Sequence, residues 1–178
     1  MAASEGSRSS VESRTKMERT SDRELRIERS FEAPARIVFD AWTRAELVSR
    51  WWAPSALGVE IRSCEADVRV GGRYRYVLQA RAATVLAFSG EYREVVPHSR
   101  LVYTSSFEPT ASGAVGEPAV VTVSFDEQDG RTRLVARELY PSKQVLDDVL
   151  ASGMETGMRA TMDQLDELVK TLVREPRP

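Results

Sequence analysis

The chain of 178 residues is long enough to form one domain with a sizeable hydrophobic core. Its 25 basic and 27 acidic residues are interspersed and give a net charge of −2, which supplies no electrostatic attraction for nucleic acid or an anionic membrane. Cys64 is the only cysteine, so an intrachain disulfide and a thiolate metal cluster are excluded, and a reducing, cytoplasmic location is expected.

The N-terminal residues contain no apolar stretch of the kind found in secretory signals, and no run approaches the roughly 20 apolar residues that cross a bilayer. They are rich in Ser, Arg and Glu, a composition that cannot bury enough surface to become ordered. We therefore predict a disordered arm at residues 1–21, a single domain at 22–173 and a flexible tail at 174–178.

Residues 24–31 alternate apolar and charged side chains, which predicts a strand. Pro34 suits the first turn of a helix, and two short helices are predicted at 34–43 and 44–52. From there to Tyr140 the apolar pattern has a period of two and is interrupted by Gly, Pro and Asp, which predicts six more strands. These six strands are expected at 59–67, 73–79, 84–95, 100–108, 119–127 and 132–140.

After Ser142, apolar residues recur every three or four positions, which predicts one continuous helix of seven or eight turns at about 143–172. Short connections make the six strands antiparallel neighbours, and the long helix is the element able to cover the apolar face of their sheet. The expected fold is therefore α+β with a helix-grip shape. A curved antiparallel sheet wraps around the C-terminal helix, and two short helices follow the first strand.

Five stretches resemble the START-like (SRPBCC) superfamily and, within it, the family related to the activator of heat-shock-protein-90 ATPase. They are FEAPARIVFDAWTRAELVSRWW, DVRVGGRYRY, GEYREVVPHSRLVYT, VTVSFDEQDGRTRL and SGMETGMRATMDQLDEL, and the resemblance covers roughly residues 22–172. It implies a hydrophobic cavity between the sheet and the long helix, which much of the superfamily uses for ligands.

The sequence offers little catalytic chemistry. His98 is the only histidine and lies in a predicted turn, no spacing of metal ligands occurs, and no nucleophile or phosphate-loop motif is present. We expect no catalytic residue, no metal and no cofactor. Gly153 and Gly157 lie four residues apart in the predicted long helix and indicate close packing on the sheet, with space for a ligand as the alternative.

Aromatic side chains fall on the strand faces that are expected to point inward. Tyrosine hydroxyls need partners and Met side chains adapt to variable shapes, so these residues suit a cavity, although they could also pack an ordinary core. Glu138 shares the face of Leu134 and would add a carboxylate, unless the strand frays there and Glu138 is solvated. The candidate cavity residues are Trp52, Tyr74, Tyr76, Phe88, Tyr92, Tyr103, Phe107, Glu138, Met154 and Met158.

Trp51 and Trp52 cannot both point the same way, because neighbouring side chains diverge on a helix or a strand. We predict that Trp51 packs in the core and that Trp52 covers the mouth of the cavity.

The favoured function is binding of a small apolar or aromatic molecule by a monomer or homodimer, without a nucleic-acid or membrane partner. One alternative is a polyketide-cyclase-like enzyme, for which only Glu138 and the tyrosines could supply acid–base groups. The other is a chaperone-associated role in the stress response, which the family resemblance implies and which would require a protein partner.

Overall fold

A computed structural model describes residues 14–81, 84–109 and 116–175. The chain begins with strands β1 (Lys16–Arg19) and β2 (Glu24–Phe31), helices α1 (Ala35–Thr43) and α2 (Ala45–Val48) and the 3₁₀ turn η1 (Ser55–Leu57). The strands that follow are β3 (Glu60–Ala66), β4 (Arg73–Gln79), β5 (Val85–Val96), β6 (Arg100–Pro109), β7 (Ala119–Gln128) and β8 (Arg131–Leu139). Helices α3 (Lys143–Ala151) and α4 (Met154–Arg174) end the described chain.

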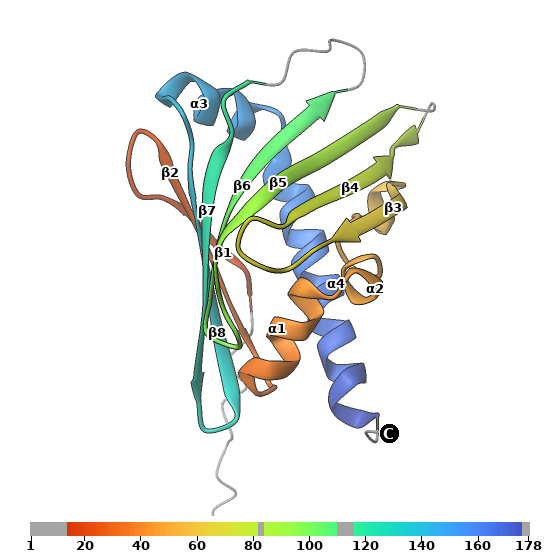
Figure 1. Cartoon of the computed structure of the whole chain (residues 1–178). Coiled ribbons are helices and arrows are strands. Elements are labelled where there is room, and N and C mark those ends of the chain that lie inside the picture. The colour runs from red at the N-terminus through yellow and green to blue at the C-terminus, as the bar shows by residue number, and fades with distance from the viewer. Residues whose placement is uncertain (1–13, 82–83, 110–115, 176–178) are drawn as a thin grey trace, which may run out of the picture.

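The described strands form one antiparallel sheet of eight strands in the order β1-β2-β8-β7-β6-β5-β4-β3. The sheet is curved and does not close on itself, and α4 runs across its concave face (Figure 1). Leu146 of α3 and Met162 and Leu165 of α4 are fully buried against it. The predicted α+β helix-grip fold is confirmed.

One part of the predicted N-terminal arm is wrong, because residues 16–19 form strand β1. The backbone of β1 pairs with the exposed edge of β2, with Met17 opposite Ile27. The side chain of Thr15 is buried and accepts a hydrogen bond from Arg29 Nη1 at 3.0 Å. Residues 1–13 of the predicted arm lie outside the described residues, as do residues 176–178 of the predicted tail.

The predicted continuous C-terminal helix is also wrong, because it is interrupted between α3 and α4. Gly153 has a φ of 80°, a left-handed conformation that glycine adopts without a steric penalty, and the break occurs there. No described side chain or backbone atom lies within 4 Å of a Cβ built at Gly153, and the nearest to one at Gly157 is Pro54 Cγ at 3.9 Å. The close helix–sheet packing expected at these two glycines is therefore absent.

The second predicted helix is shorter than expected, because α2 ends at Val48. The next residues turn tightly, and the backbone N–H groups of Trp51 and Trp52 both donate to the carbonyl of Val48, at 3.1 and 3.0 Å. Gln164 of α4 holds this segment in place. Its Nε2 donates to the carbonyls of Trp51 (3.0 Å) and Ala53 (2.7 Å), and its Oε1 accepts from the backbone N–H of Ser55 at 2.9 Å.

Candidate functional site

All five tyrosines of the chain point into the interior between the sheet and its helices, and each is buried: Tyr74, Tyr76, Tyr92, Tyr103 and Tyr140. The register of the sheet arranges inward-facing residues in two rows that run across the strands. One row contains Cys64, Tyr76, Phe88 and Phe107 on β3 to β6. The other contains Tyr92, Tyr103, Val121, Glu138 and Leu25 on β5, β6, β7, β8 and β2.

The predicted aromatic residues form one continuous set of ring contacts that runs from the surface into the interior. Phe107, at the outer end, is 47 % exposed, and its ring centroid lies 5.1 Å from that of Phe88. Phe88 and Tyr76 both contact Trp52, with centroid distances of 6.1 and 5.2 Å. The contacts continue from Tyr76 to the other interior tyrosines at 4.9–5.8 Å, reaching Tyr74, Tyr92 and Tyr103. We call this set of residues the aromatic path.

The two adjacent tryptophans lie in different environments. Trp51 is 1 % exposed, and its indole N–H donates to the carbonyl of Ala41 at 2.8 Å. Trp52 is half-buried and faces Tyr76 and Phe88. Trp51 therefore packs in the core as predicted, and Trp52 lies in the aromatic path.

Glu138 lies deep in the interior, on the same face of β8 as the buried Leu134 and Ala136. The hydroxyl of Tyr140 donates to Glu138 Oε2 at 2.5 Å. Desolvation raises the pKa of the Glu138 carboxyl, and the hydrogen bond from Tyr140 offsets part of that rise. Part of the surface of Glu138 remains accessible to solvent, so the residue is not fully enclosed.

The tyrosine hydroxyls make several internal contacts. Tyr74 donates to the carbonyl of Thr104 at 2.9 Å, and the hydroxyls of Tyr76 and Tyr92 interact with each other. Desolvation raises the pKa of Tyr92 to about 12 and raises the pKa of each of the other four tyrosines. The hydroxyls therefore stay protonated at neutral pH, and the single donors of Tyr74 and Tyr140 are already used within the protein.

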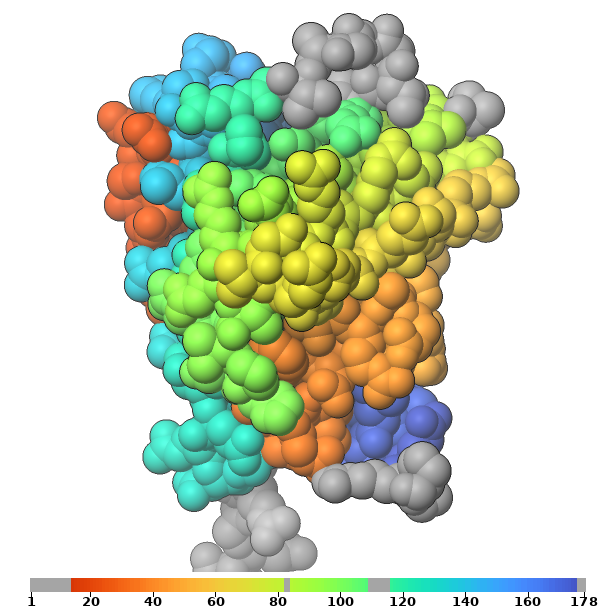
Figure 2. Space-filling view, viewed as in Figure 1, coloured from red at the N-terminus to blue at the C-terminus, as the bar shows by residue number. Residues whose placement is uncertain are grey.

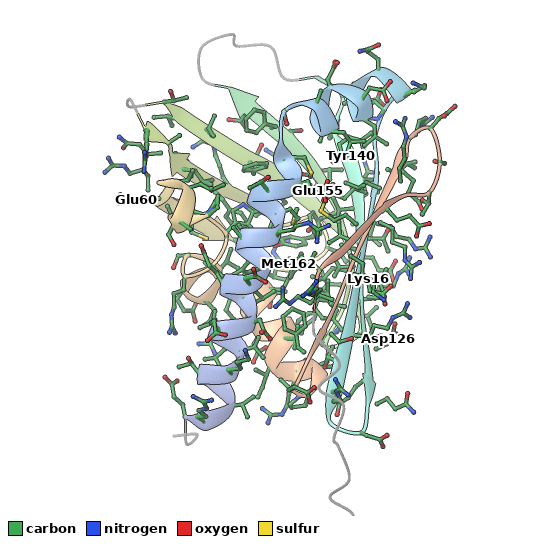
Figure 3. All side chains as sticks on the ribbon, turned by 180° about the vertical axis from the view of Figure 1, so that it is seen from behind. Lys16, Glu60, Asp126, Tyr140, Glu155 and Met162 are labelled. Atoms are coloured by element: carbon green, nitrogen blue, oxygen red, sulfur yellow. The ribbon has the colours of Figure 1, made fainter. Side chains whose placement is uncertain are left out.

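Met154 and Met158 line the helix side of this region. Both are half-buried and pack against the hydrophobic core from the first turns of α4. Met162, one turn further along, is fully buried on the sheet side of the same helix, and Tyr140 lies below α3 at the end of β8 (Figure 3). Flexible thioethers at the accessible end of α4 can adjust to molecules of different shape.

Two glycines set the position of the tyrosines. A Cβ at Gly90 would lie 1.7 Å from the carbonyl oxygen of Thr104 and 2.7 Å from the ring of Tyr74, so only glycine fits there. Gly72 accepts a backbone hydrogen bond from Tyr92 at 2.9 Å, and a Cβ at Gly72 would collide with the carbonyl of Asp67. The loop between β3 and β4 thus fixes the backbone of Tyr92.

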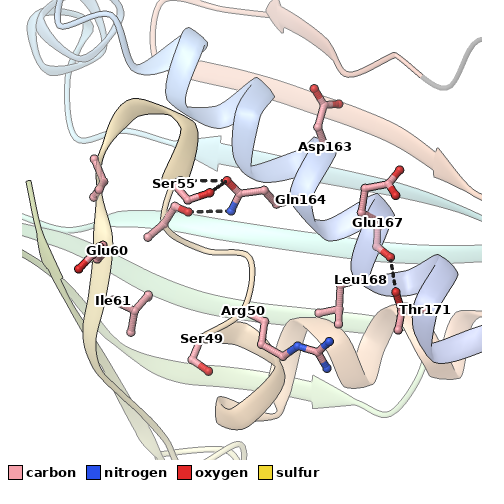
Figure 4. A pocket seen from close by; sticks show the side chains of 12 residues that line it. Ser49, Arg50, Ser55, Glu60, Ile61, Asp163, Gln164, Glu167, Leu168 and Thr171 are labelled. Atoms are coloured by element: carbon pink, nitrogen blue, oxygen red, sulfur yellow. Dashed lines mark hydrogen bonds between the residues drawn. The ribbon is translucent and has the colours of Figure 1, made fainter. Parts of the chain in front are cut away.

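Two hollows on the surface are lined mostly by residues outside the aromatic path. The larger, of about 650 Å³, is an open groove between α4 and the segment from α2 to β3, with Ile61 and Leu168 among its lining residues (Figure 4). The smaller, of about 470 Å³, lies among Glu65, Arg75 and Glu91 on strands β3 to β5, which are yellow to green in Figure 2.

Cys64 and Tyr140 belong to the interior cluster but were not among the predicted site residues. Tyr140 follows Glu138 by two residues, so the period of two would have placed both on one face. Cys64 pairs with Tyr76 across the strands, and desolvation raises the pKa of its thiol to about 11, which keeps it protonated.

His98 lies in the turn between β5 and β6 and is exposed, as expected of a turn residue. Its φ of 62° is left-handed, and its ring contacts the edge of Phe39 at 5.5 Å between centroids. Within residues 14–81, 84–109 and 116–175, no three His, Cys, Asp or Glu residues converge in a way that could hold a metal ion. None of the described helices is both long and apolar enough to cross a membrane.

A curved antiparallel sheet that grips a C-terminal helix is the helix-grip fold of the START-like (SRPBCC) superfamily. Within it, the chain belongs to the family described as Activator of Hsp90 ATPase homolog 1-like protein, which matches residues 32–170. A comparison with curated proteins finds no match.

Three solved structures illustrate the similarity. A protein of Rhodobacter sphaeroides has a TM-score of 0.78 and 22 % identity, covering 89 % of this chain and 99 % of its own. A protein of Nitrosomonas europaea has a TM-score of 0.75 and 23 % identity, and the match covers 88 % of this chain and 100 % of that protein. A protein of Staphylococcus epidermidis has a TM-score of 0.70 and 25 % identity, and the match covers 92 % of this chain and 98 % of that protein. These likenesses concern the fold.

Proposed function

We propose that the protein binds a small apolar or aromatic molecule in the interior between the sheet and helices α3 and α4. The observation that carries this proposal is the aromatic path, which runs from the exposed Phe107 through the half-buried Phe88 and Trp52 to the buried tyrosines. Rings that lead from the surface into the interior would line a route for an apolar molecule.

The half-buried residues support the same proposal. Trp52, Phe88, Met154 and Met158 pack against the core yet retain accessible surface, so a bound molecule would bury apolar area that is now exposed. Aromatic rings also prefer edge-to-face or offset contacts with other rings, which favours an aromatic ligand in this environment. A flat aromatic molecule fits this environment well.

The test is a fluorescence titration with N-phenyl-1-naphthylamine, an uncharged aromatic probe. The protein is expected to enhance the emission of the probe saturably, while the tryptophan emission decreases. Trp52→Ala is expected to weaken binding by about five- to a hundredfold, because a buried aromatic contact commonly contributes one to a few kcal/mol.

Leu57→Ala is the matched control, since Leu57 is a large apolar residue that is 45 % exposed outside the aromatic path. This variant is expected to bind the probe like the unmodified protein. The proposal fails if the probe does not bind, or if Leu57→Ala and Trp52→Ala weaken binding equally.

A further inference from the structure

The interior contains one carboxyl group in an otherwise apolar and aromatic environment. Glu138 lies between Val121 on β7 and Leu25 on β2, which are 4 % and 2 % exposed. Its hydrogen-bond partner is the uncharged hydroxyl of Tyr140. Among the described residues Glu138 forms no ion pair, whereas Arg29, a buried charged side chain that also points inward, pairs with Asp163 and Asp166.

An unpaired carboxylate in such a place is costly, since burial removes its hydration and no basic side chain replaces it. Burial thus favours the protonated form of the carboxyl group, which is the direction of its raised pKa. A molecule that brings its own positive charge would remove the penalty, because the carboxylate could then ionise beside it. A molecule that brings a negative charge would be repelled.

The rings around Glu138 favour the same kind of molecule. Tyr74 and Tyr103 are close enough to Glu138 for its charge to raise the pKa of both hydroxyls, and their rings contact each other at 5.5 Å between centroids. The faces of tyrosine and tryptophan rings attract cations, most strongly where water is excluded. A carboxyl group and several aromatic rings together form the usual environment for an ammonium group.

We propose that the natural ligand is an amine with an apolar or aromatic body, whose ammonium group binds beside Glu138 and whose body lies along the aromatic path. This inference rests on the proposed function and names the chemical class of the ligand. It excludes fatty acids and other carboxylates as preferred ligands.

The test compares three probes with the same naphthalene body in calorimetric titrations: 1-naphthylmethylamine, 1-naphthalenemethanol and 1-naphthoate. The amine is expected to bind about tenfold or more tightly than the alcohol, and the carboxylate more weakly than both. Glu138→Gln keeps the shape of the side chain but cannot ionise. This variant is expected to bind the amine no better than the alcohol, and its affinity for the alcohol should stay within about twofold.

Glu60→Gln, which removes a carboxylate in the surface groove, is the control and should leave all three affinities unchanged. Equal binding of the amine and the alcohol, tightest binding of the carboxylate, or an amine preference that survives Glu138→Gln would overturn the inference while leaving the proposed function intact. If none of the three probes binds, the proposed function itself fails. Retained binding of the alcohol shows that the Glu138→Gln variant is folded.

Discussion

Trp51 and Trp52 show how two adjacent, chemically identical residues acquire different roles from their surroundings. Trp51 is enclosed by the core and satisfies its indole N–H internally, whereas Trp52 turns toward the aromatic path. Trp51→Ala is therefore expected to lower the free energy of unfolding by about 3–5 kcal/mol, because it leaves a large cavity. Urea denaturation measures this loss.

Trp52→Ala is the natural comparison for this prediction. It is expected to cost about 1–2 kcal/mol, since the ring is only half-buried and water can fill part of the space. Equal losses of stability in the two variants would contradict the division of roles between the two rings.

Glu138 makes a prediction about stability and pH. Its pKa is higher in the folded protein than the value of about 4.3 for an exposed Glu, so the folded state holds the proton more tightly than the unfolded state. Stability is therefore expected to fall as the pH rises from about 4.3 through the raised pKa, by about 1.4 kcal/mol for each unit of pKa difference. The tyrosines that face Glu138, Tyr74, Tyr103 and Tyr140, stay uncharged throughout this range because their pKa values are raised as well.

Urea denaturation of ligand-free protein between pH 4 and pH 8 checks this effect, with Glu138→Gln as the comparison. The variant lacks the ionisable group and should lose less stability than the unmodified protein over this range. It should also be the more stable of the two at neutral pH. A steeper loss in the variant would show that the folded protein stabilises the ionised carboxylate.

Among the elements, β2 and α4 are joined by an ion cluster that the sequence did not reveal. Arg29 points inward from β2, is 5 % exposed, and pairs with Asp163 at 2.5 Å and Asp166 at 3.3 Å on α4. Asp166 is buried as well and also pairs with Lys170 at 2.9 Å. The cluster fixes the long helix to the strand next to the sheet edge.

Arg29→Met is expected to lower the free energy of unfolding by about 3 kcal/mol. This loss is near the lower end of the range for breaking a buried ion pair, because Asp166 retains its ion pair with Lys170. Thermal or urea unfolding measures the loss. Arg131→Ala, which removes an exposed pair with Glu32, should cost less than about 1 kcal/mol. If adding Asp166→Leu to Arg29→Met does not recover part of the loss, the two side chains are not energetically coupled.

Most elements could be predicted from the sequence because their side chains repeat with a clear period. The strands at 24–31 and 73–79 were placed at their observed ends, and the others within a residue, because apolar and polar side chains alternate without interruption. Strand β1 was missed because four mostly charged residues carry no such pattern. Its position depends on pairing with β2 and on the contacts of Thr15 with Arg29 and Arg159, which are distant in sequence.

The break between α3 and α4 was missed for the opposite reason. The apolar stripe continues through it, because Leu146 before the break and Met162 after it both face the sheet. A single Gly inside an apolar stripe does not reveal its φ, so Gly153 could not be recognised as the end of a helix.

Part of the candidate site could be predicted from the period of two along each strand, which places Tyr74 and Tyr76 on one face. The register that aligns inward residues of neighbouring strands in rows comes from the structure. Arg29 occupies an inward position in the pattern of Leu25, Ile27 and Phe31, but its charge assigns it to the polar face when the sequence is considered alone. Its partners come from α4, about 130 residues later, and only the tertiary structure brings them together.

At the scale of the whole molecule, the sheet and the helices enclose an interior that is aromatic on the strand side and rich in methionine on the helix side. The end of α4 near α3 stays partly accessible, while further along the helix Met162 and Leu165 seal the core. The part of the interior near Met162 and Leu165 is thus tightly packed. The part near the start of α4 is partly accessible and lined by flexible methionines, and we call it the adaptable end. The central claim is that the adaptable end binds an apolar molecule.

The most direct measurement is an NMR titration of protein labelled with ¹³C at the methionine methyl groups, using N-phenyl-1-naphthylamine as the probe. The methyl signals of Met154 and Met158 are expected to shift saturably, because both half-buried side chains pack against the core from the accessible end of α4. The signal of Met17 on the edge strand β1 should stay in place. Unchanged signals for Met154 and Met158 at probe concentrations that saturate the fluorescence would place the probe elsewhere and contradict the account.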